Sequence, residues 1–595
     1  MNLKDAIKAM RLSHKEQEHH QLYTIWGEAL NPNDVRKEYP RPQLVRSQYT
    51  ILNGTWNYKI TDSNLLPEEY PGRILVPFSP ESVLSGVNRQ LLPGEVLWYQ
   101  RSFRITQISS NKRCILHFDA VDQSCEVYIN RKKVAQHTGG YLPISIDITK
   151  ELRLGQNSIE VSVTDESDTS YHSRGKQKLK RGGMFYTAQS GIWQTVWYEW
   201  VPYTYIRSLK ITPNYDESKV RIEIGLNQEG KESSSQEGLE FTAEVYANDQ
   251  LIVQKSCNCR CVILPIQNRI SWSPENPFLY QLKIQVGEDF VESYFAMRKI
   301  SVATGKDGIP RIQLNNENYF QNGVLDQGYW PDGLYTAPSD EAMVFDIQKM
   351  KELGFNMLRK HIKIEPLRWY YHCDRLGMLV WQDMVNGGEA YHPLYVSYLP
   401  TISNRAVYMK DHNYRKTSRK NKKGREEWLS ECRQTVKHLY NCPCIVVWVP
   451  FNEGWGQFDA KEAVTEIKTI DKSRLIDHAS GWFDQKVGDI KSEHNYFRKL
   501  TVDLDDRAFV ISEYGGYACY IEHHSYSSQI YGYRKFDTME HLSERYQRLF
   551  EEEVHPLIEK GLSAAVYTQL SDVEDEVNGL LTYDRKVVKV PPINL

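Results

Sequence analysis

The sequence predicts a multidomain protein in which two β-sandwiches precede a (β/α)8 TIM barrel. Its 595 residues are too many for one hydrophobic core, so about three to four domains are expected. Short β-rich runs fill the first half, whereas buried strands alternate with helical patterns after about residue 310. We divide the chain into an N-terminal helical leader (1–45), a jelly-roll-like, sugar-binding-type sandwich (46–201), an immunoglobulin-like sandwich (202–305) and a barrel (306–595).

The composition is that of a soluble globular protein, with 41% hydrophobic and 25% charged residues. The formal net charge of −3 gives no support to binding of nucleic acid or a membrane surface. No stretch approaches the ~20 apolar residues that span a bilayer, and the N-terminus lacks the apolar segment of a secretory signal. The ten cysteines are ordinary for a reducing compartment, so we expect a cytoplasmic protein.

The leader and the first sandwich are separated by a change in sequence pattern, from a helical one to short β-rich runs. Residues 3–18 are predicted to form a short helix, and from Leu52 β-branched and aromatic runs are divided by turns. Such spacing is typical of an all-β sandwich. The predicted strands include 55–60, 114–118 and 126–129, with 190–197 as the closing strand.

The second sandwich begins at Pro202, and its strands alternate with period two, as half-buried strands do. About 100 residues of this kind suit an immunoglobulin-like sandwich. Cys257, Cys259 and Cys261 are expected on one face of a strand. Because a second half-site with zinc spacing is lacking, we prefer reduced, structural thiols to a metal site. The predicted strands are 209–212, 220–224 and 241–245, with a hairpin-like loop at 233–236.

The last part of the chain reads as repeated strand and helix units, which suit one (β/α)8 barrel, with a doubly wound sheet as the alternative. The predicted helices are 340–353, 368–376 and 426–440. The predicted strands are 356–359, 378–381, 445–449, 475–478, 490–496, 509–511 and 564–567.

Two glutamates stand where the catalytic groups of such a barrel lie, at the C-terminal ends of strands. Glu453 follows the strand 445–449, and Glu513 ends the strand 509–511. A carboxylate there loses hydration, and burying it costs free energy unless it is paired with a positive charge or has a catalytic role. Each could be the ion-pair partner of a Lys or Arg. Two of them flanked by aromatic residues favour glycoside hydrolysis, which needs two carboxyl groups with pKa values pushed apart.

The order of motifs along the chain resembles glycoside hydrolase family 2, which includes β-galactosidases, β-glucuronidases and β-mannosidases. The resemblance runs from about Arg41 to the C-terminus. It implies a retaining exo-β-glycosidase that works by double displacement, with a β-galactosidase as the first choice. Nothing in the sequence demands a cofactor, since a carboxylate pair needs no metal for this reaction. A β-glucuronidase, β-mannosidase, arabinosidase or inactive carbohydrate-binding protein is the alternative. The motifs are LNGTW at 52–56, SGIW at 190–193, WSPENP at 272–277, GFNMLR at 354–359 and LGMLVW at 376–381.

The resemblance also implies roles for individual residues. Glu453 would be the acid/base, with a raised pKa, Glu513 the nucleophile, and Asn452 a contact to the sugar 2-hydroxyl. Tyr496 resembles the family tyrosine that donates a hydrogen bond to the nucleophile, with a core or rim tyrosine as the alternative. Arg359 is expected to hold the nucleophile ionised through its charge. Further substrate-binding candidates, each with a structural role as the alternative, are His361, Asp383, Trp455, Trp482 and His494.

Three departures from the family pattern bear on the substrate. The run 184–189 has no acidic residue where the resemblance implies one in the sugar pocket. Tyr567 or Gln569 replaces a tryptophan after the eighth strand, and a glutamine would hydrogen-bond where an indole stacks. The Asn-x-Lys element with which β-glucuronidases bind a carboxylate is missing after Asn578, which lowers the expectation of glucuronide hydrolysis.

Seven basic residues lie at 415–425, in the predicted loop after the third barrel strand. Such runs are usually solvated, but if this one were ordered over the pocket it would attract an acidic or sulfated glycan. The expected partner is therefore a glycoside or oligosaccharide substrate. Nucleic acid and membrane are not expected partners, and a homo-oligomer is compatible with the sequence.

Overall fold

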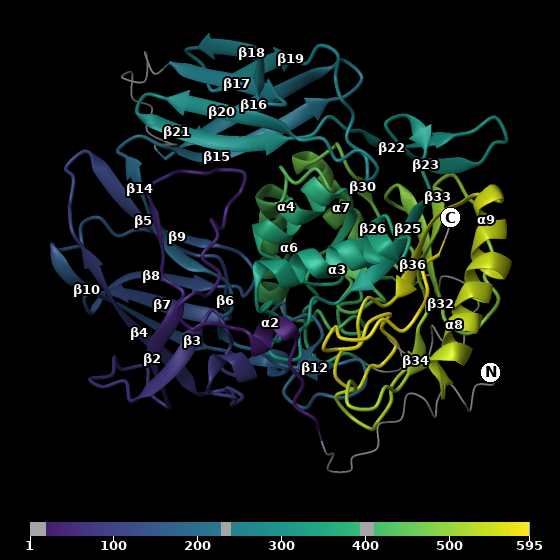
Figure 1. Cartoon of the computed structure of the whole chain (residues 1–595), viewed down its shortest axis with the longest axis horizontal. Coiled ribbons are helices and arrows are strands. Elements are labelled where there is room, and N and C mark those ends of the chain that lie inside the picture. The colour runs from purple at the N-terminus through teal and green to yellow at the C-terminus, as the bar shows by residue number, and fades with distance from the viewer. Residues whose placement is uncertain (1–18, 228–239, 393–409, 594–595) are drawn as a thin grey trace.

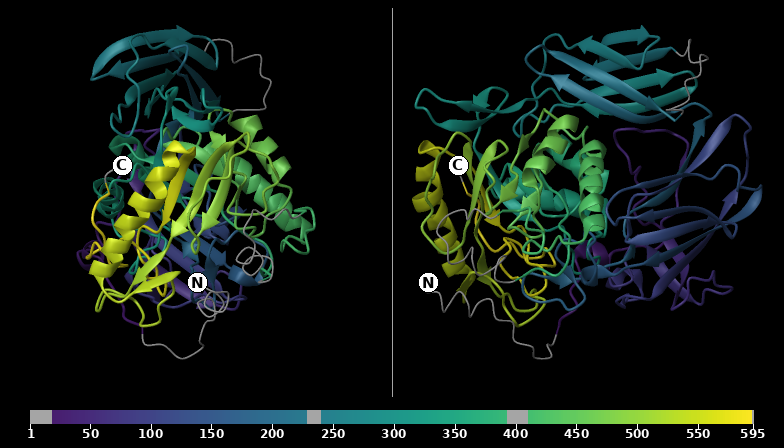
Figure 2. Two further views of the ribbon diagram at one scale, coloured as in Figure 1. Left: turned by 90° about the vertical axis from the view of Figure 1, so that its right-hand side faces the viewer. Right: turned by 180° about the vertical axis from the view of Figure 1, so that it is seen from behind.

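The computed structural model describes residues 19–227, 240–392 and 410–593. The helix predicted over 3–18 and the loop at 233–236 lie outside these residues. Two β-sandwiches and a barrel follow one another along the chain, and both sandwiches contact the barrel (Figures 1 and 2). None of the helices within the described ranges is long and apolar enough to cross a membrane.

The described part of the leader packs on the barrel domain. Its short helix α2 (Ile25–Glu28) is capped by Thr24, whose hydroxyl accepts a hydrogen bond from the Gly27 backbone amide. The Thr24 amide and hydroxyl both donate to Asp332, at 2.8 and 2.7 Å. Trp26 packs edge-on against Trp330.

The first domain is a sandwich of a six-stranded sheet, β3-β2-β4-β10-β7-β8, and a four-stranded sheet, β1-β14-β5-β9. Burial alternates along strands such as β7, because successive side chains point to opposite faces. The predicted closing strand is interrupted: β13 (Gly191–Ile192) pairs with β6 (Val121–Asp122), and only then does β14 begin. The strands of the two large sheets are β1 Tyr49–Ile51, β2 Gly54–Thr61, β3 Gly72–Val76, β4 Val96–Ile105, β5 Lys112–Phe118, β7 Ser124–Ile129, β8 Lys132–Thr138, β9 Ile144–Asp147, β10 Gly155–Thr164 and β14 Val196–Pro202.

The second domain pairs a three-stranded sheet, β15-β16-β19, with a four-stranded sheet, β18-β17-β20-β21. Its inward residues form an apolar core of their own. This is the predicted immunoglobulin-like sandwich. Its strands are β15 Ile206–Asn214, β16 Lys219–Leu226, β17 Phe241–Ala247, β18 Gln250–Cys257, β19 Cys261–Pro265, β20 Tyr280–Val286 and β21 Asp289–Phe295.

The prediction for the three neighbouring cysteines was wrong. Cys257 ends β18 and Cys261 begins β19 of the other sheet, so the three residues span the turn that connects the two sheets instead of sharing one face of a strand. The turn brings the Cα atoms of Cys257 and Cys259 to 5.4 Å, within the usual reach of a disulfide, and the two are bonded. Cys261 is a free thiol.

Eight parallel strands form the third domain, in the order β30-β28-β27-β26-β25-β36-β33-β32. Numbered along the chain, this order is 5-4-3-2-1-8-7-6, which is a (β/α)8 barrel opened between its fifth and sixth strands. The doubly wound alternative is therefore wrong. The strands are β25 Gln321–Asp326, β26 Met357–Lys360, β27 Leu379–Asp383, β28 Ile445–Val449, β30 Leu475–Ile476, β32 Ile490–Asn495, β33 Ala508–Gly515 and β36 Leu562–Thr568.

The barrel helices cover the outside of these strands (Figure 1). The Ser339 hydroxyl caps α3 by accepting from the Ala342 amide, and Gly377 ends α4 in the left-handed conformation that glycine adopts at low cost. The small sheet β22-β23-β24 joins the second domain to the barrel. The barrel helices are α3 Asp340–Glu352, α4 Leu367–Leu376, α6 Lys422–His438, α7 Ala460–Ile470, α8 Met539–Arg548, a π-helix Leu549–Val554 and α9 His555–Glu559. The strands of the small sheet are β22 Ile300–Thr304, β23 Pro310–Leu314 and β24 Glu317–Asn318.

Candidate active site

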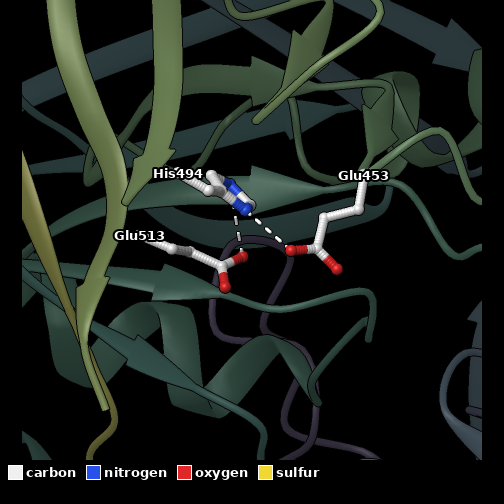
Figure 3. Close-up of side chains that lie close together, drawn as sticks. All are labelled: Glu453, His494 and Glu513. Carbon is white, nitrogen blue, oxygen red and sulfur yellow. Dashed lines mark hydrogen bonds and ion pairs between the residues drawn. The ribbon is translucent and has the colours of Figure 1, made fainter. Parts of the chain in front are cut away.

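Two glutamates and a histidine meet at the C-terminal mouth of the barrel. Figure 3 shows the carboxyl groups of Glu453 and Glu513 with the His494 ring beside both. His494 Nδ1 lies 2.8 Å from Glu453 Oε1, and Nε2 lies 3.5 Å from Glu513 Oε1. One oxygen of each carboxylate lies within 4.8 Å of the other. The two groups therefore have the spacing of carboxylates that act on opposite sides of one bond.

Glu453 and Glu513 reach the mouth of the barrel from the ends of two of its strands. β29 (Phe451–Asn452) follows β28, and Glu453 comes next with a φ of 52°, in the left-handed region. Such a conformation in a residue other than glycine costs of order 1 kcal/mol or more and is concentrated at functional sites. Glu513 lies inside β33, which extends beyond the predicted strand to Gly515.

The surroundings of Glu513 favour its ionised form. Arg359 Nη1 donates to Oε1 at 3.0 Å, and the Tyr496 hydroxyl donates to Oε2. Burial alone would raise the pKa of Glu513, but the neighbouring His494 and the guanidinium group of Arg359 lower it to about 2. Glu513 is therefore a carboxylate at neutral pH.

Arg359 holds several groups of the site in fixed positions. Its Nε and Nη2 donate to the two oxygens of Asp383, both at 3.0 Å. His361 Nδ1 lies 2.8 Å from Asp383 Oδ2, and burial lowers the pKa of this histidine well below its usual value. Arg359 Nη2 also donates to Asn452 Oδ1 at 2.8 Å. The Asn452 Nδ2 atom is buried without a hydrogen-bond partner among the described residues, which leaves a donor beside Glu453.

Two tryptophans lie close to Glu453, one in space and one along the chain. The Trp482 indole donates to the Glu453 backbone carbonyl at 2.9 Å and meets the His494 ring edge-on. Trp455 is buried and stacks on Phe185 of the first domain, with ring centroids 5.5 Å apart. Flat apolar faces of this kind can pack on a sugar ring.

Tyr567 and Gln569 do not contact the carboxyl pair. Tyr567 packs edge-on against Tyr546 of α8, because it points to the outer face of β36. The next residue, Thr568, points inward and lies 3.3 Å from the Tyr496 hydroxyl. Gln569 is fully buried, and its amide is already bonded to Gln327 and Asn578, at 2.7 and 2.8 Å. We therefore leave both out of the proposed substrate contacts.

The basic run 415–425 is only partly the solvated loop that was expected. Its last residues begin α6 at Lys422. Arg419 is buried, donates through Nε to the Gly456 carbonyl at 2.7 Å, and lies over the Phe458 ring. The expectation of a solvated loop was wrong for Arg419, because aromatic rings of the barrel cover its guanidinium group.

A segment of the first domain, residues 173–187, borders the site, and only its last residues, from Met184, were singled out in the sequence. The Arg174 and Gly175 amides donate to the Asn386 carbonyl beyond β27, at 2.8 and 3.0 Å. At its other end, the Tyr186 hydroxyl donates to Glu576, which also accepts from Asn578. The dense charge of 174–181, with five Lys or Arg residues, is the signal that could have identified it.

Glu453, His494 and Glu513 are of the type that binds metal ions. One possible ligand atom from each of the three lies within 4.8 Å of the others, close enough to hold a metal ion. However, Arg359 and the Tyr496 hydroxyl already occupy both oxygens of Glu513. A fixed cation at 3.0 Å opposes a second cation at the same carboxylate.

Family models match each of the three domains. Glycosyl hydrolases family 2, sugar binding domain, matches residues 87–202; Glycosyl hydrolases family 2 matches 204–298; and its TIM barrel domain matches 336–568. The β-galactosidase of Leuconostoc mesenteroides is 25% identical over 77% of this chain and 42% of its own length. The chain spans between 34% and 54% of the length of the first curated relatives that it matches.

Solved structures share the whole fold. The β-D-glucuronidase of Dictyoglomus thermophilum aligns over 93% of this chain and 97% of its own, with a TM-score of 0.71 and 17% identity. The β-glucuronidase of Ruminococcus gnavus covers the same shares, with a TM-score of 0.70. With the three domain matches in sequence order on one continuous fold, the chain belongs to glycosyl hydrolases family 2.

Proposed function

We propose that this protein is a retaining exo-β-glycosidase, with Glu453 as acid/base and Glu513 as nucleophile. The observation that carries the proposal is the pair of carboxylate oxygens within 4.8 Å at the barrel mouth. Retaining enzymes place their carboxyl groups about 5–5.5 Å apart, whereas inverting enzymes leave room for a water molecule between them. Phe185 and Tyr186 of the first domain contact Trp455 and Glu576 of the barrel. A wall on this side of the site would favour removal of a terminal sugar.

The proposed reaction has two steps. Glu513 attacks the anomeric carbon and forms a glycosyl ester, while Glu453 donates its proton to the departing glycosidic oxygen. Glu453 then takes a proton from water, the resulting hydroxide attacks the anomeric carbon, and Glu513 leaves as a carboxylate. The Asn452 Nδ2 donor lies beside this centre and would bond a sugar hydroxyl.

A terminal β-galactoside is the first candidate substrate, with a β-glucuronide as the second. Relatives named β-galactosidase and relatives named β-glucuronidase both match this chain. β-Mannosides and arabinosides are further candidate substrates. A carbohydrate-binding protein without activity is the alternative from another class, and the intact carboxyl pair disfavours it, because binding alone does not need both groups.

A panel of nitrophenyl glycosides tests the proposal. The parent should hydrolyse at least one β-glycoside, and Glu513→Gln should lose that activity by several orders of magnitude. Binding of a sugar without hydrolysis of any member of the panel would make the inactive binding protein the better explanation.

The two roles can be separated by added azide. With Glu453→Ala, azide should accelerate turnover of an activated substrate and give the β-glycosyl azide, because the glycosyl ester still forms on Glu513. With Glu513→Ala, azide should attack directly and give the α-glycosyl azide. Products of the opposite configuration would reverse the assignment.

A further inference from the structure

We propose that Lys176, a residue of the first domain, binds an anionic group on the terminal sugar and so makes this enzyme selective for acidic glycosides. The proposal rests on the proposed glycosidase function and narrows its substrate class, because it places an acidic glycoside ahead of the neutral β-galactoside. The anionic group would be the carboxylate of a hexuronic acid or a sulfate ester, which share charge and acceptor geometry.

The 173–187 segment fixes Lys176 at the mouth of the barrel. Backbone hydrogen bonds to the Asn386 carbonyl hold the two residues before it. After it, the Tyr186 amide donates to the Lys176 carbonyl at 3.0 Å. The Gly175 Cα lies so close to the barrel that an added Cβ would sit 3.1 Å from the Ile362 carbonyl. The lysine is therefore built into the site and does not belong to a free surface loop.

Lys176 is a buried cation without a counter-ion. Its side chain is buried at 7% relative exposure, and Nζ lies 5.7 Å from the ring centroids of both Trp455 and Tyr186. The other three buried lysines of the described chain each bond a carboxylate: Lys360 bonds Asp326, Lys363 bonds Glu365 and Lys589 bonds Asp572. Among the described residues, no carboxylate lies within 4.0 Å of Lys176 Nζ. Leaving such a charge unpaired is costly, and an incoming anion would offset that cost.

The charge of Lys176 acts on the reaction centre. Its charge contributes to the lowered pKa values of both Glu513 and His361, so it acts on the groups at the base of the pocket. Trp455, two residues after Glu453, forms one of the two rings that flank the ammonium group. An anion on a sugar held between the two carboxyl groups would therefore meet Lys176 within the same pocket.

An anion suits this position better than a neutral hydroxyl. An ammonium group flanked by aromatic rings has lost much of its water, and a charged acceptor forms a stronger hydrogen bond with it than a neutral one does. Lys176 supplies a positive charge to the pocket from a different domain.

The test compares charged and neutral substrates on matched variants. The panel contains nitrophenyl β-glucuronide, β-galacturonide and 6-sulfo-β-galactoside, with the neutral β-galactoside and β-glucoside as references. The parent should prefer a charged member. Lys176→Met should lower kcat/KM for that member about 10- to 100-fold and for the neutral sugars less than about 3-fold. Lys180→Met, at an exposed lysine of the same segment, is the matched control and should change neither.

Other outcomes separate the explanations. Preference for the uronides or for the sulfated galactoside identifies which anion is bound. An equal loss on charged and neutral sugars in Lys176→Met would overturn the proposal, as would a parent that prefers the neutral sugars. A melting curve checks that the variant is folded, and Lys176→Gln, which is closer to lysine in polarity, should repeat the selectivity change.

A binding experiment keeps this inference separate from the proposed function. Calorimetry on Glu513→Gln should show that glucuronate or galacturonate binds more tightly than galactose, and that Lys176→Met removes the difference. If the parent hydrolyses no glycoside but this difference is present, the proposed function fails and the role of Lys176 stands. If the parent hydrolyses glycosides but Glu513→Gln binds the uronates no more tightly than galactose, Lys176 does not bind an anion.

Discussion

At the scale of single residues, the chemistry of the site depends on how Glu513 is kept ionised. A buried carboxylate is unfavourable by itself, so its charge must be met by fixed donors. Arg359 and Tyr496 supply two of them, one to each oxygen. Each donor can be weakened separately, and the two substitutions have different expected signatures.

Removing the Tyr496 hydroxyl should slow the reaction without unfolding the protein. Tyr496→Phe keeps the ring, which stacks on Tyr533 at 3.6 Å, and deletes only the donor to Glu513. A hydrogen bond to a charged group is worth about 1.5–3 kcal/mol, so kcat should fall about 10- to 100-fold. Steady-state kinetics with the preferred nitrophenyl glycoside measures this. An unchanged kcat would show that the contact is structural.

Substituting Arg359 should change the pH dependence. The pKa of Glu513 is depressed to about 2, so this residue stays ionised until the pH falls toward 2. Arg359→Lys keeps one charge but cannot make all of the arginine contacts, so the pKa of Glu513 should rise toward its usual value. The acid limb of the kcat/KM profile should then move to higher pH. A limb that stays in place would mean that Arg359 does not control the nucleophile.

At the scale of elements, the 173–187 segment decides whether the pocket is complete. It belongs to the first domain, but its contacts are with loops of the barrel. The close approach at Gly387 is part of this arrangement, since Ser173 forms a β-bridge with it. Without a side chain there, the two backbones can touch.

A methyl group at Gly387 should push the segment away. The Cβ of Gly387→Ala would lie 2.5 Å from the His172 carbonyl and 2.7 Å from the Ser173 Cα, and both are backbone atoms that cannot rotate away. KM for the preferred glycoside should rise several-fold, and trypsin should cut faster after Lys178 and Lys180. The matched control is Ala390→Gly, which removes a methyl group nearby. Equal trypsin rates in parent and variant would contradict the prediction.

At the scale of the whole molecule, buried ion pairs join the domains. Arg46 donates to Glu199 of the first sandwich at 3.1 Å and to Asp289 of the second at 2.8 Å. All three side chains are almost inaccessible to water. Glu199 is also bonded to Arg41, at 2.7 Å, so the carboxylate that depends on Arg46 for its charged partner is Asp289 of the second domain. Leaving that buried carboxylate unpaired is costly, which ties the second domain to the first.

Arg46→Ala should therefore destabilise the junction strongly. The loss of one partner of a buried ion pair costs about 3–5 kcal/mol. Lys37→Ala, which removes an exposed partner of Asp34, should cost less than about 1 kcal/mol and is the control. Urea denaturation followed by tryptophan fluorescence measures both. Similar midpoints for the two variants would show that the buried pair does not stabilise the junction.

The sequence by itself predicted the elements whose signal is local. The apolar run 445–449 is β28, and the strand before Glu513 was found because its residues are continuously apolar. β25 was not predicted, because it begins with Gln321 and Asn322, polar residues that are buried only by the complete barrel. Tyr567 was assigned to the pocket although it points outward, since a fully buried strand shows no alternation that reveals its inner face.

The tertiary structure alone decided what surrounds the carboxyl pair. Tyr186 and Glu576 are separated by 390 residues, and Lys176 meets Trp455 from another domain. No periodicity or motif records such contacts, because they depend on how the folded domains pack. The positions of Glu453 and Glu513 could be predicted because an apolar run in the sequence precedes each of them and marks a barrel strand. The charge of the pocket that holds the sugar follows from the packing of one domain on another.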